Sequence, residues 1–339
     1  MPDLSPKRLK NDARLALLSV KNGNHKRIVF LYSIIVLGLS FINSLAYFII
    51  DLLIQNTAGG LSGLDTTGTL KGIASIIDLL STLATPFLTM SLMHCAIGFA
   101  RQDPMEPKSL KEGFYRWGVF LRLILCQGIM YILMFYLAVV AASTLYFMLP
   151  NAGSTLLQVE PIVTQFQSTG TVTDAQALLL VQTMWPMLVI MVVLYLIVML
   201  PLSYGYRMSF YRIMDNNPPR ARRAIAQSRA MMKGRKWKLF RLDLSFWWYY
   251  LLQGLVSAVM IIVAEQLYGV IPGADLLCSI VLCSFLFLIY RIYLAYVETT
   301  YALFYDRILQ LYLPQYPTGA PEQYQTPVQF ISQPDDTNE

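Results

Sequence analysis

Six long apolar runs constrain the fold of this chain more than any other feature of its sequence. They cover residues 28–50, 73–100, 123–149, 178–206, 244–264 and 276–297. A helix rises about 1.5 Å per residue, so each run can cross a hydrocarbon core of about 30 Å. Only 14% of the 339 residues are charged, against about a quarter in a soluble domain. The sequence therefore predicts an all-α, polytopic membrane protein with six transmembrane helices, whose transmembrane domain comprises residues 28–308.

The loops between these runs alternate in basic charge. Seven Lys and Arg residues precede the first run, five lie in residues 101–122, and eleven lie in residues 207–241. The three connections on the opposite side together hold only one, Lys71. Because basic loops remain on the cytoplasmic side of a membrane, both termini are predicted to be cytoplasmic.

Residues 1–27 carry the signals of a short cytoplasmic helix. Ser5 followed by Pro6 is typical of a helix start, and Asn22-Gly23 of a helix end. Between them, apolar residues recur at helical spacing: Leu9, Ala13, Ala16, Leu17 and Val20. We expect a basic amphipathic helix that lies on the membrane. At the other end of the chain, residues 309–339 are rich in Pro, Gln and Thr, which predicts a disordered cytoplasmic tail.

The fourth loop repeats this amphipathic pattern. One face of residues 221–232 is mostly apolar, and Gly234 is placed to end the helix. The basic residues of this loop form a candidate lipid-facing group, here named the basic elbow: Arg222, Arg223, Arg229, Lys233, Arg235, Lys236 and Lys238. We favour a topology anchor on an anionic leaflet over a dedicated headgroup site. Asp243, which follows these bases, is expected to be ion-paired.

Residues 228–248, SRAMMKGRKWKLFRLDLSFWW, form the most distinctive motif of the chain. They resemble the signature of an uncharacterised bacterial family of integral membrane proteins, domain of unknown function 975, in which a Ser-x-x-x-Met-Lys-Gly run precedes a Lys-Leu-Phe-x-Leu-x-Leu-Ser-Phe span. The segments LKNDARLALL (9–18) and ETTYALFYDRI (298–308) are similar to that family's opening and closing motifs. Trp247-Trp248 replace the family's usual Gly-Trp, and Tyr296 lacks the usual preceding proline. The resemblance implies the six-span fold and a bacterial cytoplasmic membrane, and it implies no activity.

Four ionisable residues lie within the predicted spans, namely Asp78, His94, Arg291 and Glu298. Such groups are unfavourable in lipid and often mark functional sites. Arg291, Ala295, Glu298 and Ala302 follow one another at spacings of four, three and four, so they share one face of a helix, and that face must point into the bundle. His94 is expected at a similar depth to Glu298, so His94, Arg291 and Glu298 form a candidate intramembrane polar cluster. It could relay protons or hold an anion, and we favour a buried network that determines helix register. Asp78 is expected near the outer surface.

Candidate residues for catalysis or metal binding are few. Each of the four cysteines falls in an apolar run without CxxC spacing or a nearby histidine pair, so neither disulfides nor a zinc site is predicted: Cys95, Cys126, Cys278 and Cys283. The chain has no HExxH, GxSxG or Walker motif, and we predict no catalytic residue, no metal and no cofactor. The net charge of +6 comes from residues that flank spans, so nucleic acid is not an expected partner.

Two halves of the chain share an order of features. Pro86 and Pro201 each lie within a span. Each is followed by a loop that contains Asp and Pro, then by a basic amphipathic stretch and another span. A parallel duplication would produce this order. Coincidence is the favoured explanation, because proline is common in membrane spans.

Three hypotheses for function follow. The favoured one is a structural or accessory protein that binds membrane lipids, mainly anionic headgroups on the cytoplasmic side, or a protein partner, through its basic elbow. The second is a small transporter or permease that uses the polar groups of spans two and six. The third, an enzyme of lipid or envelope metabolism, is disfavoured because the sequence shows no cluster of carboxylates or histidines at one interface. A polar cavity lined by the candidate cluster would favour transport.

Overall fold

The computed structural model of the chain describes residues 3–20, 23–57, 66–148, 161–162, 164, 174–216, 218–267 and 274–312. Every regular element among these residues is helical. Six helical segments are long and apolar enough to cross a membrane: Asn24–Ile50, Ser75–Arg101, Trp117–Phe147, Leu188–Met214, Trp247–Leu267 and Leu276–Tyr312. The predicted fold class, an all-α polytopic membrane protein, is confirmed.

The described residues contain the following helical elements. In chain order they are α1 (Pro6–Ser19), α2 (Asn24–Thr57), α3 (Thr66–Arg101), the 3₁₀ helix η2 (Pro107–Lys111), α4 (Glu112–Tyr115), α5 (Trp117–Phe147), α7 (Asp174–Leu194), the π-helical turn η3 (Tyr195–Met199), α8 (Leu200–Tyr206), α9 (Met208–Met214), α10 (Ala221–Met232), α11 (Lys236–Leu244), α12 (Trp247–Leu267), α13 (Ala274–Ile289), the π-helical turn η4 (Tyr290–Leu294) and α14 (Ala295–Tyr312).

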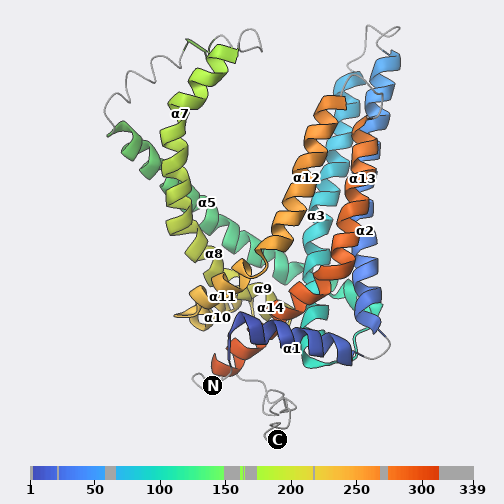
Figure 1. Ribbon diagram of the computed structural model, residues 1–339, viewed down its shortest axis with the longest axis vertical. Helices are drawn as coiled ribbons and strands as arrows, with labels where there is room; N and C mark the ends of the chain where they lie inside the picture. Colours follow the sequence, from blue (N-terminus) through green and yellow to red (C-terminus); the bar gives the residue numbers. More distant parts are fainter. Residues whose placement is uncertain are drawn as a thin grey trace, which may run out of the picture.

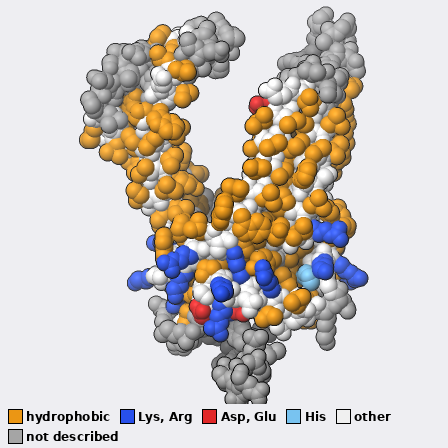
Figure 2. Space-filling view, viewed as in Figure 1, with side chains coloured by type: hydrophobic (Ala, Val, Ile, Leu, Met, Phe, Trp, Pro, Cys, Tyr) orange, Lys and Arg blue, Asp and Glu red, His pale blue; other side chains and the backbone are white. Residues whose placement is uncertain are grey.

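Two arms rise from a common base (Figure 1). One arm is the pair α5 and α7, and the other contains α2, α3, α12 and α13. Apolar side chains cover the visible face of both arms (Figure 2), and residues such as Ile132 on α5 and Ile262 on α12 are exposed. Apolar surface of this extent is incompatible with water and suits hydrocarbon. The arms are therefore the membrane-embedded part of the protein.

The base, here named the basal layer, consists of α1, α8, α9, α10, α11 and α14 (Figure 1). Most of the largest fully buried side chains belong to it, including Tyr206, Tyr211, Tyr301, Tyr305 and Phe304. The α5–α7 arm packs on this layer through α9 and α10, and α3 packs on it through α14. Much of the core of the protein thus lies where the spans end.

The apolar faces of α1 and α10 are covered by protein. Leu9 and Ala13 of α1 are fully buried, and α1 packs against α14, α3 and α11. Ala224 and Met231 of α10 are fully buried too, and α10 packs against α9, α5, α8 and α14. The apolar face of α1 is therefore not available to lipid, as a helix lying on the membrane would require, and the apolar face of α10 is covered in the same way. An amphipathic pattern shows that one face is buried, but it does not identify what covers that face.

Several boundaries differ from the predicted ones. The fifth span was predicted from residue 244, but Leu244 ends α11 and α12 begins at Trp247. The sixth span continues through η4 into α14, which ends at Tyr312, so residues 309–312 are helical and not part of a disordered tail. Leu309 is buried, which explains why the helix continues. The rest of the predicted tail, residues 313–339, lies outside the described residues. Gly234 adopts φ +74° after α10, as its predicted role in the turn requires.

Candidate functional site

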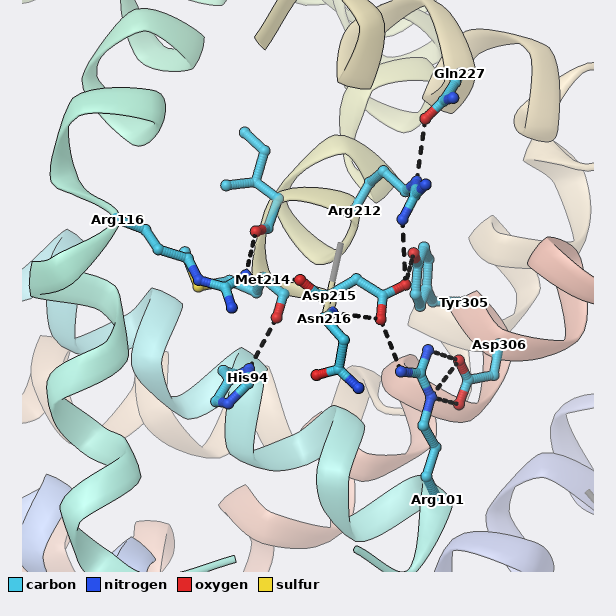
Figure 3. Close-up of polar contacts among 11 residues, drawn as sticks. His94, Arg101, Arg116, Arg212, Met214, Asp215, Asn216, Gln227, Tyr305 and Asp306 are labelled. Atoms are coloured by element: carbon cyan, nitrogen blue, oxygen red, sulfur yellow. Dashed lines mark hydrogen bonds and ion pairs between the residues drawn. The ribbon is translucent and has the colours of Figure 1, made fainter. Parts of the chain in front are cut away.

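Arg101, at the end of α3, lies in a buried ionic cluster of the basal layer (Figure 3). Its guanidinium donates to Asp215 Oδ1 at 2.7 Å and to Asp306 Oδ1 at 2.6 Å. The Asp215 side chain is 0% exposed, and those of Arg101 and Asp306 are 15% exposed. Carboxylates at such depth are stable only when they are paired and hydrogen-bonded. One arginine therefore balances two acids from different parts of the chain.

Asp215 accepts further hydrogen bonds. The Tyr305 hydroxyl donates at 2.8 Å, Arg212 at 3.4 Å and the backbone N–H of Asn216 at 2.9 Å. Arg212 also donates to Oε1 of Gln227 on α10 at 3.0 Å. The group formed by Arg101, Arg212, Asp215, Tyr305 and Asp306 is named the Asp215 cluster. It joins α3, α9, α10 and α14.

The end of α9 is capped by one arginine and one imidazole. Arg116 donates to the carbonyl oxygens of Ile213 at 2.8 Å and Asp215 at 2.6 Å. His94 Nδ1 lies 2.8 Å from the carbonyl oxygen of Met214 (Figure 3). Because a carbonyl oxygen only accepts, Nδ1 carries the hydrogen. The last carbonyls of a helix have no partner within the helix, and positive donors stabilise them.

A second group surrounds Asp243 at the end of α11 and is named the Asp243 cluster. Arg207 donates to Oδ2 at 2.6 Å, Tyr204 to Oδ2 at 2.7 Å and Tyr301 to Oδ1 at 2.6 Å. The hydroxyls of Tyr250 and Tyr301 are 3.0 Å apart. The predicted ion pairing of Asp243 is confirmed, but its partner is Arg207 and not a base of the elbow. The reason is that α11 packs against α8, which directly precedes Arg207.

Tyr211 connects the two clusters. Its hydroxyl donates to Glu298 Oε2 at 3.2 Å, and its ring stacks on Tyr305 with a centroid distance of 5.7 Å and an interplanar angle of 23°. Tyr305 belongs to the Asp215 cluster, whereas α14 also carries Tyr301 of the Asp243 cluster. Aromatic stacking of this kind adds about 0.5–1.5 kcal/mol beyond burial. Because α14 contributes side chains to both clusters, the two clusters together with Tyr211 and Glu298 are named the polar core.

The N-terminal helix is attached to the same layer by polar contacts. Lys10 donates to the carbonyl oxygen of Ser245 at 2.6 Å and lies 4.0 Å from the centroid of the Phe246 ring. Burial lowers the pKa of Lys10 from its ordinary value, because it penalises the charged form. Arg307 of α14 is ion-paired with Asp12. These contacts, together with the buried Leu9, fix α1 on protein.

The polar core is suited to holding helices in register. Its members come from α3, α8, α9, α11 and α14 and the residues next to them, and each carboxylate accepts from at least one side-chain hydroxyl or cation. A pocket of about 670 Å³ lies elsewhere, among α1, α2, η2 and η4, and neither cluster lines it. In the described part of the chain, no three His, Cys, Asp or Glu side chains are grouped as metal ligands would be.

The three residues of the candidate intramembrane cluster make no hydrogen bond or ion pair with one another in the part of the chain that the structure describes. His94 binds the Met214 carbonyl, Glu298 binds Tyr211, and Arg291 is exposed and lines the 670 Å³ pocket. The regular helical spacing that placed Arg291 beside Glu298 does not hold in this span. Residues 290–294 form a π turn, whose extra residue rotates the following helix by about 100° relative to a regular α-helix. Arg291 and Glu298 consequently do not share a face.

The basic elbow is found largely at the surface. The exposed members are Arg222, Arg223, Arg229, Lys233, Lys236 and Lys238. Arg235 is half-buried and donates to the carbonyl oxygen of Met231 at 2.9 Å. Six of the seven predicted bases are therefore free of close packing, while one caps the end of α10.

The sequence interpretation missed most of the polar core. Arg101, Asp215 and Asp306 lie at the ends of apolar runs, where a charged residue is usually assumed to be solvated. Tyr301 and Tyr305 of the last span also belong to this core, and both donate to carboxylates. The sequence did contain one usable signal, because acids lie near the ends of three spans and Arg101 lies at the end of another. It did not identify the pairs.

Comparison with known proteins adds one relationship. A family model described as "Protein of unknown function (DUF975)" matches residues 4–312. Because the match covers most of the chain, the protein belongs to this family, and the resemblance of its motifs is confirmed. No curated protein and no solved structure matches the chain. The family assignment thus extends over all described helices and supplies no activity.

Proposed function

We propose that this member of the family is a binding protein of a bacterial cytoplasmic membrane, and that its basic elbow holds anionic phospholipid headgroups. In this proposal the basal layer and both termini are cytoplasmic. The main observation that supports this proposal is the separation of acidic and basic side chains in the basal layer. Its acids are turned inward, where Asp215, Asp243 and Asp306 are bonded to arginines, while the bases of the elbow face outward.

Because the acids lie elsewhere, no nearby carboxylate neutralises the positive charges of the elbow. Residues 218–242 contain no Asp or Glu, and the nearest acid, Asp243, is occupied by Arg207. Lys and Arg side chains are visible along the base in Figure 2, below the apolar arms. A base near an anionic bilayer surface contributes about 1 kcal/mol to binding. Several such bases on adjacent helices add to a substantial local attraction.

Trp237 supports the placement of the elbow at the membrane boundary. Its side chain is 61% exposed, it stacks on Phe240 at 4.9 Å between ring centroids, and it lies between two exposed lysines in sequence. Exposed tryptophan flanked by bases is typical of the headgroup region, where the ring is half solvated. The elbow therefore combines charges with an interfacial ring, although the apolar face of α10 is covered by protein.

The transporter hypothesis receives less support. It uses the polar groups of spans two and six, but His94, Arg291 and Glu298 make no hydrogen bond or ion pair with one another among the described residues, and only Arg291 lines the pocket. A lipid-binding role requires only the exposed elbow. A protein partner that carries an acidic surface would use the same charges, and the experiment below separates it from lipid.

The proposal can be tested by lipid binding to the full chain. Protein purified in detergent and stripped of lipid is titrated with phosphatidylglycerol or phosphatidylcholine, and bound lipids are counted by native mass spectrometry at low and high salt. We expect wild type to bind an excess of phosphatidylglycerol that falls with salt. Replacing Arg222, Arg223 and Arg229 with glutamine should weaken that binding by about 1 kcal/mol per charge.

A charge-matched control variant replaces Lys7, Arg8 and Lys111, which are exposed but lie outside the elbow, with glutamine. It should retain the excess. Equal loss in both variants would indicate a general charge effect and contradict the elbow. Equal binding of the two lipids at all salt concentrations would contradict lipid recognition and leave an acidic protein as the partner to seek.

A further inference from the structure

A pocket of about 670 Å³ lies on a different part of the protein from the elbow, where α2 begins and η4 joins α14. Its polar lining consists mainly of positive or imidazole side chains: His25, Lys26, Arg27 and Arg291. None of the described residues that line it is acidic. The pocket therefore has a strong preference for an anion.

Arg291 is the least expected of these residues. It lies within the sixth apolar span, is exposed, and makes no ion pair within the described part of the chain. By contrast, Arg101, Arg207 and Arg307 each contact a carboxylate. An arginine in a membrane span is unfavourable unless it reaches a partner or the headgroup region. Arg291 also lies in the π turn of η4, and such turns frequently occur at functional sites.

The start of α2 adds to the positive potential. This helix has 34 residues and no acid in its first turn, where His25, Lys26 and Arg27 stand. The N-terminus of a helix carries free N–H groups and a partial positive charge that attract anions. His25 Nδ1 is buried and has no hydrogen-bond partner among the described residues.

The other half of the pocket is apolar. Leu17, Phe30, Leu31 and Ile292 line it, and Phe30, Leu31 and Ile292 are 41%, 38% and 63% exposed. These side chains continue onto the lipid-facing surface of α2 and the sixth span. A free phosphate would use only the basic half of a pocket this large. A molecule with a phosphate and an attached hydrocarbon chain would use both halves.

We propose that this pocket binds one anionic phospholipid. Its phosphate lies between Arg291 and the bases of the first turn of α2, and an acyl chain lies on Phe30, Leu31 and Ile292. The site is discrete and does not rest on lipid binding by the elbow, because no residue of α10 or α11 lines it. Its occupant would tie α2 to α14 and screen Arg291 within the bilayer.

The test counts tightly bound lipid on the full chain by native mass spectrometry. Delipidated protein in detergent receives phosphatidylglycerol, phosphatidylcholine, or phosphatidylglycerol in the presence of excess glycerol 3-phosphate. We expect one phosphatidylglycerol to remain bound at concentrations where phosphatidylcholine does not. Arg291→Gln and Arg27→Gln should each weaken it about tenfold or more, as loss of one charge-assisted contact does.

Three comparisons make the test decisive. The glutamine triple at Arg222, Arg223 and Arg229 should keep the tightly bound lipid, so failure of the elbow proposal and of this one can be told apart. Arg291→Lys keeps the charge and should retain most of the lipid binding. It serves as a control for the possibility that the glutamine variant loses lipid because it is misfolded. Ile292→Ser should weaken the binding of phosphatidylglycerol without changing the charge of the site.

Other outcomes would overturn the site. Equal retention of phosphatidylcholine would exclude anion recognition, and complete displacement by glycerol 3-phosphate would show an anion site that does not need the hydrocarbon chain. Unchanged binding in a folded Arg291→Gln variant, verified by an unchanged melting temperature, would place the lipid elsewhere.

Discussion

Arg101 and Asp215 are separated by 114 residues in the chain, yet their side chains meet at 2.7 Å inside the basal layer. The same guanidinium contacts Asp306, so one arginine joins the end of the third helix to the segment after α9 and to α14. This relationship explains how spans that share little packing in the α5–α7 arm and the four-helix arm are held together at their ends.

Removal of Arg101 should strongly destabilise the protein. Arg101→Gln leaves two carboxylates without their common cation, and breaking a buried ion pair in this way costs about 3–5 kcal/mol. The measurement is the midpoint and free energy of unfolding of the full chain in detergent. Arg122→Gln, which removes an exposed arginine from the neighbouring arm, should change stability by less than about 0.5 kcal/mol.

Combining Arg101→Gln with Asp306→Asn provides a second check. The double variant should be more stable than the sum of the single changes predicts, because it removes the charge together with its partner. If Arg101→Gln unfolds with the same midpoint as Arg122→Gln, the cluster does not stabilise the fold.

Each tyrosine hydroxyl that donates to Asp243 should contribute measurably to the free energy of unfolding. Tyr301→Phe and Tyr204→Phe remove donors to a partly buried carboxylate at 2.6 and 2.7 Å, and bonds to charged groups are worth about 1.5–3 kcal/mol. Thermal unfolding in detergent gives the loss. Tyr115→Phe is the matched control, because this side chain is 75% exposed, and it should be neutral. Equal midpoints for all three variants would argue against a structural role for the cluster.

Gly113 should tolerate no side chain. A Cβ there would lie 2.2 Å from the Phe87 carbonyl oxygen and 2.4 Å from Ser91 Oγ, and the Gly113 N–H donates to that same oxygen at 2.9 Å. Since the nearest atom is backbone, Gly113→Ala should separate α4 from α3 and lower stability by about 1–3 kcal/mol.

Gly118 is the natural comparison for this position. It lies five residues further on, in α5, and a Cβ there would meet nothing within 4 Å. Gly118→Ala should be neutral or stabilising by up to about 1 kcal/mol, because alanine favours a helix. Comparable loss of melting temperature in both variants would show that close packing at Gly113 is not the cause.

Orientation in the membrane can be measured by cysteine labelling. In a background without the four native cysteines, Ala226→Cys on exposed α10 should be protected from an impermeant thiol reagent in intact cells, because the basic side is expected to be cytoplasmic. Ser154→Cys, in the loop without Lys or Arg, should react. Permeabilised cells provide the control, in which Ala226→Cys becomes reactive. The reverse pattern would place both termini outside.

Several features were determined by the sequence alone. The number of spans followed from local apolar runs, because in lipid each backbone amide must be bonded within its own helix. The turn at Gly234 followed from one residue that adopts φ +74° without strain. Both depend on a short stretch of chain, and for that reason each could be predicted without knowing where the other helices lie.

Only the tertiary structure decided which surfaces and charges meet. The amphipathic pattern of α1 predicted that one face is buried, but the helix that packs on that face, α14, lies almost 300 residues away in the chain. Arg291 and Glu298 were placed together by regular helical spacing, and the π turn at Tyr290–Leu294 separates them. Asp215 was one of several acids next to a span, and its choice of Arg101 depends on how α3, α9 and α14 converge. Pairing between distant residues is a property of packing, and no local pattern in the sequence encodes it.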